Sequence, residues 1–419
     1  MIDEKWLSDK APVCSNRRGF LQGVAAVTAG GALGVSIPLQ GADIVAGASA
    51  QEAATPLPEY VKWKNPDAMI VHSDQTLETR RAYTGSVITP EEQLYVRNNI
   101  KAPDDSFIAD RDGWKLEITG VKSPTVLSVA ELKTMGLTTV AMVLQCSGNG
   151  RAYFQEKLKG TDKAIKGTSW ALGAAGCVAW TGVPLKTVIE AVGGASPGAK
   201  FITGTGGEKI PAGLNPKDII VERSVPISNL DTVLLAWELN GKPISLAHGG
   251  PLRMIVPGYA GVNNVKYVAK LSLTDTETDA KIQKTRYRVH DMGTEGSADV
   301  PSVWAMDVKS WVTSPLSDGK AGRVTVAGVA FGGMNAVQEV EISTDGGKNW
   351  HKADFVGPDL GRFAWRQFAL STELEPGSYT LVSRATDATG KTQPEEPELN
   401  AGGYSHNGWL APGVKISLA

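Results

Sequence analysis

Residues 140–151 read VAMVLQCSGNGR, and this stretch joins an apolar strand to a loop that ends in a cation. Val140–Leu144 is an unbroken apolar run of strand length, which is typical of a strand buried on both faces. Cys146 follows, and the glycines after it make the next turn flexible. A thiol at a strand end, five residues before Arg151, is placed to be exposed and deprotonated. The stretch therefore predicts a sheet whose end carries a soft sulfur ligand for a metal.

The cysteines also admit two other interpretations. Cys146 is either a buried structural cysteine or the partner of Cys177 in a disulfide. Cys177 lies in the apolar run Ala174–Ala179, which favours a plain core position for it. Three cysteines are too few for a disulfide framework. On the residues alone, the three interpretations of Cys146 stay open.

The segments around this stretch alternate between short strands and helices. Predicted strands cover Leu116–Ile118, Leu252–Val256 and Val265–Leu273, and predicted helices begin at Ser128 and cover Pro184–Val192. Ser128 is a good helix cap, and an acid follows it in the first turn. From Gln51 to about Lys101 the sequence is polar and rich in proline, so we expect loops there. This mixture predicts an α+β domain over residues 51–301.

Beyond about Pro301 the pattern changes to the period-two alternation of half-buried strands. The clearest such segments are Val324–Ala330, Val337–Ser343 and Tyr379–Thr386. The segment 344–350 (TDGGKNW) between two of them predicts a tight turn. Short strands with few helical periods predict a β-sandwich of immunoglobulin type over residues 302–419.

Composition and the first fifty residues narrow the class of protein. Lys and Arg number 42 against 44 Asp and Glu, so no basic face points to nucleic acid. Asn16–Leu21 reads NRRGFL, a twin-arginine box, and an Ala- and Gly-rich run follows it. Ala48–Ala50 supplies the small residues of a cleavage site, so residues 1–50 are predicted to be a signal peptide. The apolar run is too short to span a bilayer. We therefore expect a periplasmic protein without a membrane span, exported folded with its cofactor already inserted.

Five blocks of sequence, in this order, resemble the sulfite oxidase family. They are Tyr95–Asn99 (YVRNN), Cys146–Arg151 (CSGNGR), Lys166–Trp170 (KGTSW), His248–Arg253 (HGGPLR) with Asn264–Tyr267 (NVKY), and Lys284–Tyr287 (KTRY) ahead of Pro301–Trp304 (PSVW). Any one block is weak, but five in order are specific. The resemblance covers essentially the whole mature chain. It implies a molybdopterin-binding catalytic domain followed by an immunoglobulin-like dimerisation domain, and hence a homodimer.

The resemblance implies a molybdenum atom held by one molybdopterin and by one cysteine thiolate, which is Cys146 here. It also implies a set of residues that hold the pterin and its phosphate: Tyr95, Val96, Arg97, Asn98, Asn99, His248, Arg253, Asn264, Val265 and Lys266. The residue chemistry agrees, because a buried phosphate needs cations and amide donors. Three residues that can supply such groups, His248, Arg253 and Lys266, lie close together in the sequence.

The implied reaction is the oxidation of sulfite to sulfate. By the same resemblance Arg97 and Arg151 bind the substrate, Tyr287 hydrogen-bonds near the metal, and Trp170 forms a pocket wall. Arginine suits an oxyanion because it does not lose its charge. No Cys-x-x-Cys-His motif occurs, so we expect no haem in this chain and a separate periplasmic c-type cytochrome as the electron acceptor.

Several departures from the family pattern bear on substrate binding. Asn99 replaces a histidine, and glycines between Phe201 and Gly207 replace an acidic cofactor contact. Gly402 stands where the family has a third active-site arginine. Arg288 is a candidate to compensate, although we expect it to be an exposed strand charge.

Three rival functions follow from the sequence. Ala305–Ser310 (AMDVKS) resembles the sulfane dehydrogenase subunits of thiosulfate-oxidising systems, although these relatives lack the pattern that ends at Arg151. The sulfoxide reductases of the superfamily share twin-arginine export but lack the β-sandwich. The third rival is a non-enzymatic exported binding module. The alternative to the dimer is a monomer whose sandwich docks only on its own catalytic domain.

Overall fold

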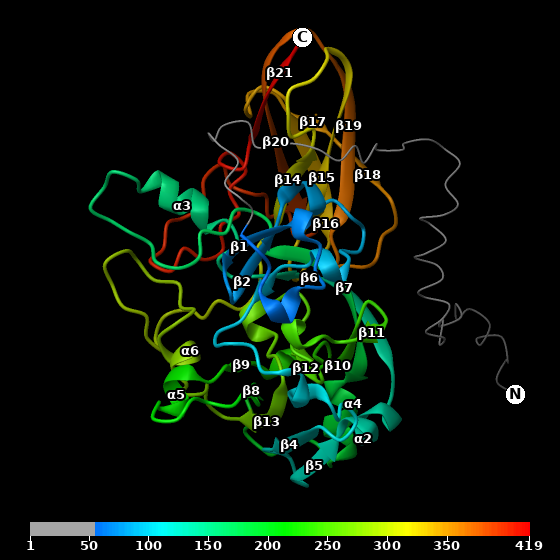
Figure 1. Cartoon of the computed structure of the whole chain (residues 1–419), viewed down its shortest axis with the longest axis vertical. Coiled ribbons are helices and arrows are strands. Elements are labelled where there is room, and N and C mark those ends of the chain that lie inside the picture. Colours follow the sequence, from blue (N-terminus) through cyan, green and yellow to red (C-terminus); the bar gives the residue numbers. More distant parts are fainter. Residues whose placement is uncertain (1–54) are drawn as a thin grey trace, which may run out of the picture. The chain divides into compact units, whose positions relative to one another are not determined.

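The computed structural model describes residues 55–419, which Figure 1 colours along the chain. The predicted twin-arginine signal and its cleavage site lie outside these residues. None of the helices in the described range has the length and apolar character needed to cross a membrane.

The cysteine strand belongs to a five-stranded antiparallel sheet. The sheet has the order β11 (Lys242–Pro243), β10 (Leu234–Leu239), β7 (Ala175–Pro184) and β6 (Thr138–Gln145), and β12 (Arg253–Ile255) also pairs with β10. The apolar run that was predicted as a buried strand lies within β6. Its residues Ala141 to Leu144 are all buried. This sheet holds Cys146 at the end of β6.

A second five-stranded sheet packs with two helices around the largest apolar cluster. Its order is β5 (Thr125–Ser128), β4 (Lys115–Thr119), β13 (Val268–Thr274), β8 (Phe201–Gly206) and β9 (Glu222–Pro226), and only β4 and β13 run parallel among these pairs. The helices are α2 (Val129–Thr134) and α4 (Leu185–Ala191). The cap predicted for α2 is confirmed, because the Ser128 hydroxyl accepts from Glu131 N at 3.2 Å and the Glu131 carboxylate accepts from Ser128 N at 2.7 Å.

The remaining helices are short. They are α3 (Arg151–Lys157), α5 (Pro216–Ile219), α6 (Lys281–Lys284), and the 3-10 turns η1 (Glu59–Val61), η2 (Pro66–Ala68), η3 (Arg81–Tyr83), η4 (Glu91–Gln93), η5 (Asp105–Ile108), η6 (Ile227–Asn229), η7 (Leu246–His248) and η8 (Gly261–Asn263). Strand β13 begins three residues later than predicted. Tyr267, with φ of 50°, ends the loop before it, and this loop carries Lys266.

The expectation of loops from residue 51 to 101 was wrong in part. A small antiparallel sheet forms there from β1 (Met69–Ser73), β2 (Thr76–Thr79) and β3 (Val96–Arg97). Short runs of apolar and β-branched residues carry it, and Met69, Leu77 and Val96 bury their side chains in one cluster. The prolines that suggested loops lie outside these strands.

The predicted β-sandwich is confirmed. One sheet has the order β14 (Lys309–Ser314), β15 (Gly322–Phe331), β19 (Arg366–Leu374) and β18 (Asp354–Val356), and the other β17 (His351–Lys352), β16 (Val337–Ser343), β20 (Gly377–Asp387) and β21 (Val414–Leu418). All the strand pairs are antiparallel, and an apolar cluster fills the space between the sheets. The predicted turn follows β16, where the Asp345 carboxylate accepts from the backbone of Lys348 and Asn349.

Backbone groups of the α+β part and of the sandwich part are bonded directly. Val143 N of β6 donates to Phe363 O at 2.8 Å, and Ser405 N donates to Ser147 O at 2.9 Å. The buried Lys309 of β14 donates its Nζ to Asn149 O at 3.1 Å. The sandwich part therefore holds the cysteine strand and the loop that follows it.

Candidate active site

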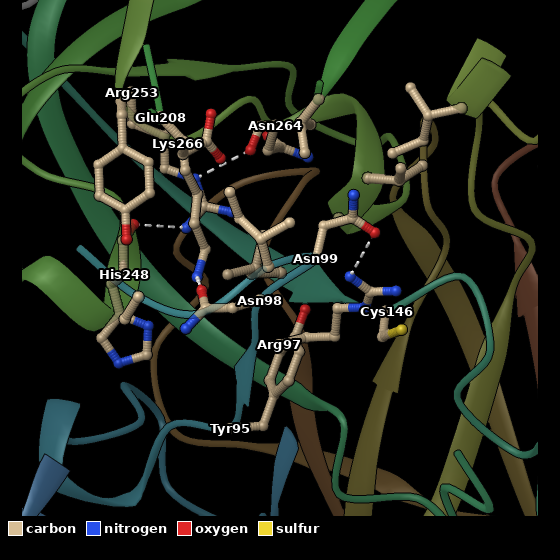
Figure 2. Close-up of a pocket in the computed structure, with 18 of the residues that line it drawn as sticks. Tyr95, Arg97, Asn98, Asn99, Cys146, Glu208, His248, Arg253, Asn264 and Lys266 are labelled. Carbon is tan, nitrogen blue, oxygen red and sulfur yellow. Dashed lines mark hydrogen bonds between the residues drawn. The ribbon is translucent and has the colours of Figure 1, made fainter. Parts of the chain in front are cut away.

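A cavity that opens to solvent lies where the first sheet, the small sheet and the loop before β13 meet. Ten of the predicted residues line it: Tyr95, Arg97, Asn98, Asn99, Cys146, His248, Arg253, Asn264, Lys266 and Tyr287. Figure 2 shows His248, Arg253 and Lys266 grouped at one side and Cys146 at the other. The cavity is thus lined by a thiol at one end and by cations at the other.

Four predicted residues do not line the cavity: Val96, Val265, Arg151 and Trp170. Val96 points into the apolar core because neighbouring residues of a strand face opposite ways, and Arg97 takes the cavity side. Val265 is fully buried in the main apolar cluster. Trp170 is 1% exposed and lies behind Tyr95, with ring centroids 6.3 Å apart.

The cationic end of the cavity is built by side chains that bind backbone carbonyls. Arg253 donates from Nη1 to His248 O at 2.9 Å and from Nε to Asn264 O at 3.0 Å. Lys266 Nζ donates to Asn98 Oδ1 and to Ala247 O, each at 2.5 Å. These bonds join the segments around His248 and Lys266 to Asn98, which is distant in sequence, and so form one wall.

Lys64 extends this wall and was missed by the sequence analysis. Its Nζ is 3.1 Å from His248 Nε2 and donates to the carbonyls of Glu91 and Leu94, each at 2.7 Å. Burial lowers the pKa of Lys64 to about 7. Nothing in the local sequence marks this lysine, because its role depends on contacts with residues far along the chain.

Positive charge is in excess at this end. Burial lowers the pKa of Lys266 and of His248 well below their usual values, and neighbouring cations lower both further. Burial also lowers the pKa of Arg253 to about 10. Buried cations that oppose one another need an anion that is not a side chain. The residues therefore fit a phosphate group.

Glu208 is the single carboxylate among the described residues that line the cavity. It follows β8, and burial raises its pKa to about 7 while Lys266 acts in the opposite direction. The sequence analysis expected only glycines around this point. The acid lies one residue beyond the segment 201–207, so a slightly wider window would have included it.

The thiol end is held by the loop after β6. Asn149 donates from Nδ2 to Gln145 Oε1 at 2.9 Å and accepts from Ala174 N at 3.1 Å. Cys146 and Cys177 are both free thiols, so the disulfide interpretation was wrong. Cys146 is half-buried at the cavity wall, whereas burial raises the pKa of Cys177 to about 12.

A metal bound at Cys146 would need ligands from outside the protein. No group of three or more His, Cys, Asp or Glu side chains in the described range is placed to hold a metal ion. A single thiolate beside a phosphate-sized anion site fits a metal that brings its own sulfur ligands on a phosphorylated cofactor.

Of the two arginines predicted to bind substrate, Arg97 is the one at the cavity. It lines the cavity, and its Nη1 is 3.3 Å from Asn99 Oδ1. The phenol of Tyr287 is the largest influence that raises the pKa of Arg97, and the Cys146 thiol acts in the same direction. Asn99, which replaces the expected histidine, therefore orients this guanidinium and lines the cavity itself.

Arg151, which was predicted to bind substrate, does not line the cavity in this structure. Its Nε donates to Gly402 O and its Nη1 donates to Thr168 O, each at 3.0 Å. It begins α3, and its side chain is 7% exposed beneath the cysteine loop. A Cβ on Gly148 would lie 2.3 Å from Arg151 Nη2, so the guanidinium also packs against this loop. Arg151 thus braces backbone in this structure.

Tyr404 explains the glycine at position 402. A Cβ added to Gly402 would lie 2.0 Å from Tyr404 Cε2, so the tyrosine ring fills the space that a side chain would need. Tyr404 also stacks on Tyr287, with ring centroids 5.2 Å apart and planes 20° apart. An arginine at 402 and this tyrosine position exclude one another.

The expectation that Arg288 is exposed was wrong. It is 2% exposed, forms an ion pair with Glu277, and donates from Nε to Gln283 O at 2.7 Å. The local sequence does not reveal this ion pair, because Glu277 lies 11 residues before Arg288 in the chain. Its charge is therefore matched locally.

The described chain matches two family models. Residues 103–282 match the oxidoreductase molybdopterin binding domain, and residues 300–417 match the Mo-co oxidoreductase dimerisation domain. Mitochondrial sulfite oxidase of Drosophila melanogaster is 29% identical over 353 residues, which are 78% of this chain and 59% of that protein. The Homo sapiens enzyme is 29% identical over 357 residues, which are 80% and 63% of the two chains. The chain thus spans less than two thirds of the length of these relatives.

A solved structure is similar over nearly the whole chain. The sulfane dehydrogenase SoxCD of Paracoccus pantotrophus superposes with a TM-score of 0.68 at 25% identity, covering 90% of this chain and 95% of that one. Its order of domains therefore matches the order found here.

Proposed function

Because this chain belongs to the sulfite oxidase family of molybdopterin-dependent oxidoreductases, we propose that it oxidises sulfite to sulfate and passes the electrons to a separate c-type cytochrome. One observation carries the proposal. A single cavity has the free thiol of Cys146 at one end and a cluster of buried cations at the other. This pairing suits a phosphorylated cofactor whose metal binds one protein thiolate.

The cofactor is held by two sets of groups in this proposal. Cys146 binds the metal, and His248, Arg253 and Lys266, which line the cavity, hold the phosphate through hydrogen bonds, while Lys64 supports His248. When bound, the molybdenum cofactor supplies the oxygen transfer and the two-electron oxidation. The surrounding protein binds, orients and charges the cavity.

The substrate is an anion, and this chain offers Arg97 and Tyr287 to receive it. Arg97 binds without competing as a nucleophile, because its guanidinium stays protonated. Tyr287 lines the same cavity and can donate its phenol proton as a hydrogen bond. Both groups orient the substrate, and neither needs to exchange a proton with it.

A second candidate is the oxidation of a sulfane sulfur substrate. The similarity to the sulfane dehydrogenase favours it, and so does Gly402, which leaves the cavity with one arginine fewer than the family pattern. Reduction of ferricyanide or cytochrome c with sulfite and with thiosulfate tests the two. We expect sulfite to be the better substrate by kcat/KM, and a preference for thiosulfate would reverse the assignment.

Assembly and location belong to the same proposal. The match to a dimerisation domain supports a homodimer. The twin-arginine box supports export to the periplasm, where a c-type cytochrome is available as the acceptor. Metal analysis of the purified protein separates the enzyme from a non-enzymatic binding module, because the module has no need of molybdenum.

A further inference from the structure

Tyr287 is clamped between two groups outside the cavity. The Arg223 guanidinium carbon lies 5.8 Å from the centre of its ring, and the Tyr404 ring stacks on it at 5.2 Å. The backbone of Tyr287 has φ of 52°, which a bulky residue adopts only when its surroundings enforce it. The phenol is therefore held in place from several sides.

Arg223 is a buried cation with neutral partners. It is fully buried, and it donates from Nε and Nη2 to Asn263 Oδ1 (3.1 and 3.0 Å), from Nη1 to Ile282 O (2.7 Å) and from Nη2 to Ser302 Oγ (2.9 Å). In the described part of the chain no carboxylate hydrogen-bonds to it. A buried cation whose hydrogen bonds all go to neutral groups is costly, so its retention calls for an explanation.

The neighbouring arginine provides a contrast. Arg288 is also buried, but Glu277 neutralises it. Arg151 lies 5.5 Å from the centre of the Tyr404 ring, and two carbonyls bind its guanidinium. Arg151 and Arg223 thus both bond only neutral groups, and of these three arginines Arg223 is the one whose guanidinium lies next to the ring of a cavity residue.

We propose that Arg223 supplies the positive charge that draws an anionic substrate to the Tyr287 side of the cavity, and that Tyr404 is a positioning residue that holds Tyr287 against it. The inference rests on the proposed function only in naming a sulfur oxyanion as the substrate. Two anchors of Arg223, Asn263 and Ile282, lie in or beside segments that line the cavity, so its position is tied to the cavity wall. A fixed charge in a region that excludes water acts over a longer distance than it does at a surface.

The charge is tested by Arg223→Met, which keeps the length of the side chain, and by Arg223→Lys, which keeps the charge. We expect Met to raise both the KM for sulfite and the Kd for sulfate about tenfold, with a smaller effect on kcat. Sulfate affinity is measured by calorimetry on the oxidised, cofactor-loaded enzyme, and molybdenum content is checked for each variant. We expect Arg223→Lys to recover most of the loss.

The matched control neutralises a second buried arginine, Arg288. Glu277→Gln combined with Arg288→Gln removes a nearby ion pair without changing net charge, and we expect sulfate affinity to stay at the wild-type value. Arg223→Gln serves if Arg223→Met does not fold, since it keeps hydrogen-bonding groups. Sulfate binding that is unchanged in a folded, loaded Arg223→Met or Arg223→Gln variant overturns the proposal. Equal losses in Arg223→Met and Arg223→Lys also overturn it, because they would show a role of shape alone.

The positioning role has a different signature. Tyr404→Ala leaves the charge of Arg223 in place but frees Tyr287, so we expect kcat to fall about tenfold while sulfate affinity changes less. Gly402→Ala displaces the Tyr404 ring and should give the same pattern, and Tyr404→Phe should recover most of the loss. A wild-type kcat in Tyr404→Ala overturns this part.

The experiments distinguish a failure of the proposed function from a failure of the proposed role of Arg223. A wild-type enzyme that binds sulfate but does not oxidise sulfite refutes the proposed function, and the sulfate affinities of the variants still test Arg223. An enzyme that oxidises sulfite but binds sulfate equally well with and without Arg223 refutes the inference alone.

Discussion

Two free cysteines lie on neighbouring strands, and their surroundings give them different chemistry. Cys177 pairs with Val143 inside the sheet and is fully buried, whereas Cys146 follows the end of β6 at the cavity wall. A thiolate that binds metal needs access to the cavity, so only Cys146 is placed for that role.

Replacing the Cys146 sulfur with oxygen tests this assignment. We expect Cys146→Ser to fold and to lose sulfite oxidation, because a serine oxygen is a harder and poorer ligand for molybdenum. Cys177→Ala is the control, and it should lose roughly 1 kcal/mol of stability while keeping turnover. Turnover, molybdenum content and melting temperature are measured together. Wild-type turnover in Cys146→Ser would assign the metal elsewhere.

The two predicted substrate arginines should behave differently. Arg97→Gln removes a charge-assisted hydrogen bond worth about 1.5–3 kcal/mol, so we expect the KM for sulfite to rise roughly tenfold or more. Arg151→Gln instead loses bonds to the carbonyls of Gly402 and Thr168, so we expect it to lower the melting temperature more than it changes KM. A large KM effect confined to Arg151→Gln would restore the original prediction for that residue.

Lys309 gives stability a pH dependence of known sign. It is 1% exposed, and burial lowers its pKa from 10.5 to about 7. Between these values the unfolded chain binds the proton and the folded chain does not, so stability rises with pH across this window. Below pH 7 Lys309 is protonated in both states, so the folded state bears the full cost of burying its charge.

Removing this charge should therefore stabilise the protein most at the lower end of the window. We expect Lys309→Met to gain roughly 2–4 kcal/mol at pH 7, less the bond to Asn149 O, and to lose this advantage towards pH 10. Urea unfolding across that range measures the difference, with the exposed Lys348→Met as the control. An advantage that grows with pH would contradict the sign.

Some side chains of the site could be predicted from the sequence, and others could not. Cys146, Arg97 and Lys266 were found because each lies in a short block that resembles the family. Lys64 and Arg223 were missed because their roles arise from contacts between segments far apart in the chain, whereas Glu208 was missed because it lies one residue beyond the segment 201–207. Arg151 has the expected motif, yet hydrogen bonds to carbonyls turn it away from the cavity.

Elements were predicted where their periodicity was clear. The apolar run in β6, the cap of α2 and the alternating strands of the sandwich all lie where the sequence placed them. The small sheet β1–β2–β3 was missed because its strands are short and lie in a largely polar part of the chain. Pairing between β1 and β2 across a short turn, and between β2 and β3, makes those segments regular.

The loop after β6 depends on a backbone that only glycine adopts easily. Gly150 has φ of 98°, and a Cβ there would lie 2.7 Å from His406 Cβ. Gly160 has φ of 82°, and a Cβ added there would have no atom within 4 Å. A substitution at Gly160 therefore measures the cost of the backbone conformation without a steric clash. These two glycines form a matched pair.

We expect Gly160→Ala to cost roughly 1 kcal/mol and Gly150→Ala about 1–3 kcal/mol more, because the second also forces His406 away. Unfolding free energy and molybdenum content are measured for both. We expect Gly150→Ala to lose cofactor as well as stability. Equal effects of the two substitutions would show that His406 yields without cost.

At the scale of the whole molecule, we expect the sandwich part to make two contacts, one within its own chain and one with a second copy. It bonds the catalytic part of its own chain through Lys309, Phe363 and Ser405. The match to a dimerisation domain supports a second contact, with another copy. A two-fold symmetric dimer is the commonest closed assembly of identical chains.

Sedimentation at micromolar concentration tests this assembly. We expect a single species at about twice the mass of the mature chain, which is the 44.3 kDa chain less its signal peptide. A species at the mass of one chain would show that the sandwich docks on its own catalytic domain alone.

The bonds that finish the cysteine loop come from the end of the chain. Ser405 N binds Ser147 O, and Lys309 Nζ binds Asn149 O, although the loop itself begins at residue 146. A ribosome releases the N-terminal part first, so the thiol emerges long before the groups that brace its loop. A nascent or prematurely terminated chain that stops short of residue 405 has the Cys146 thiol but lacks the Ser405 amide that bonds its loop. We therefore expect metal insertion to follow translation and to favour finished molecules over fragments.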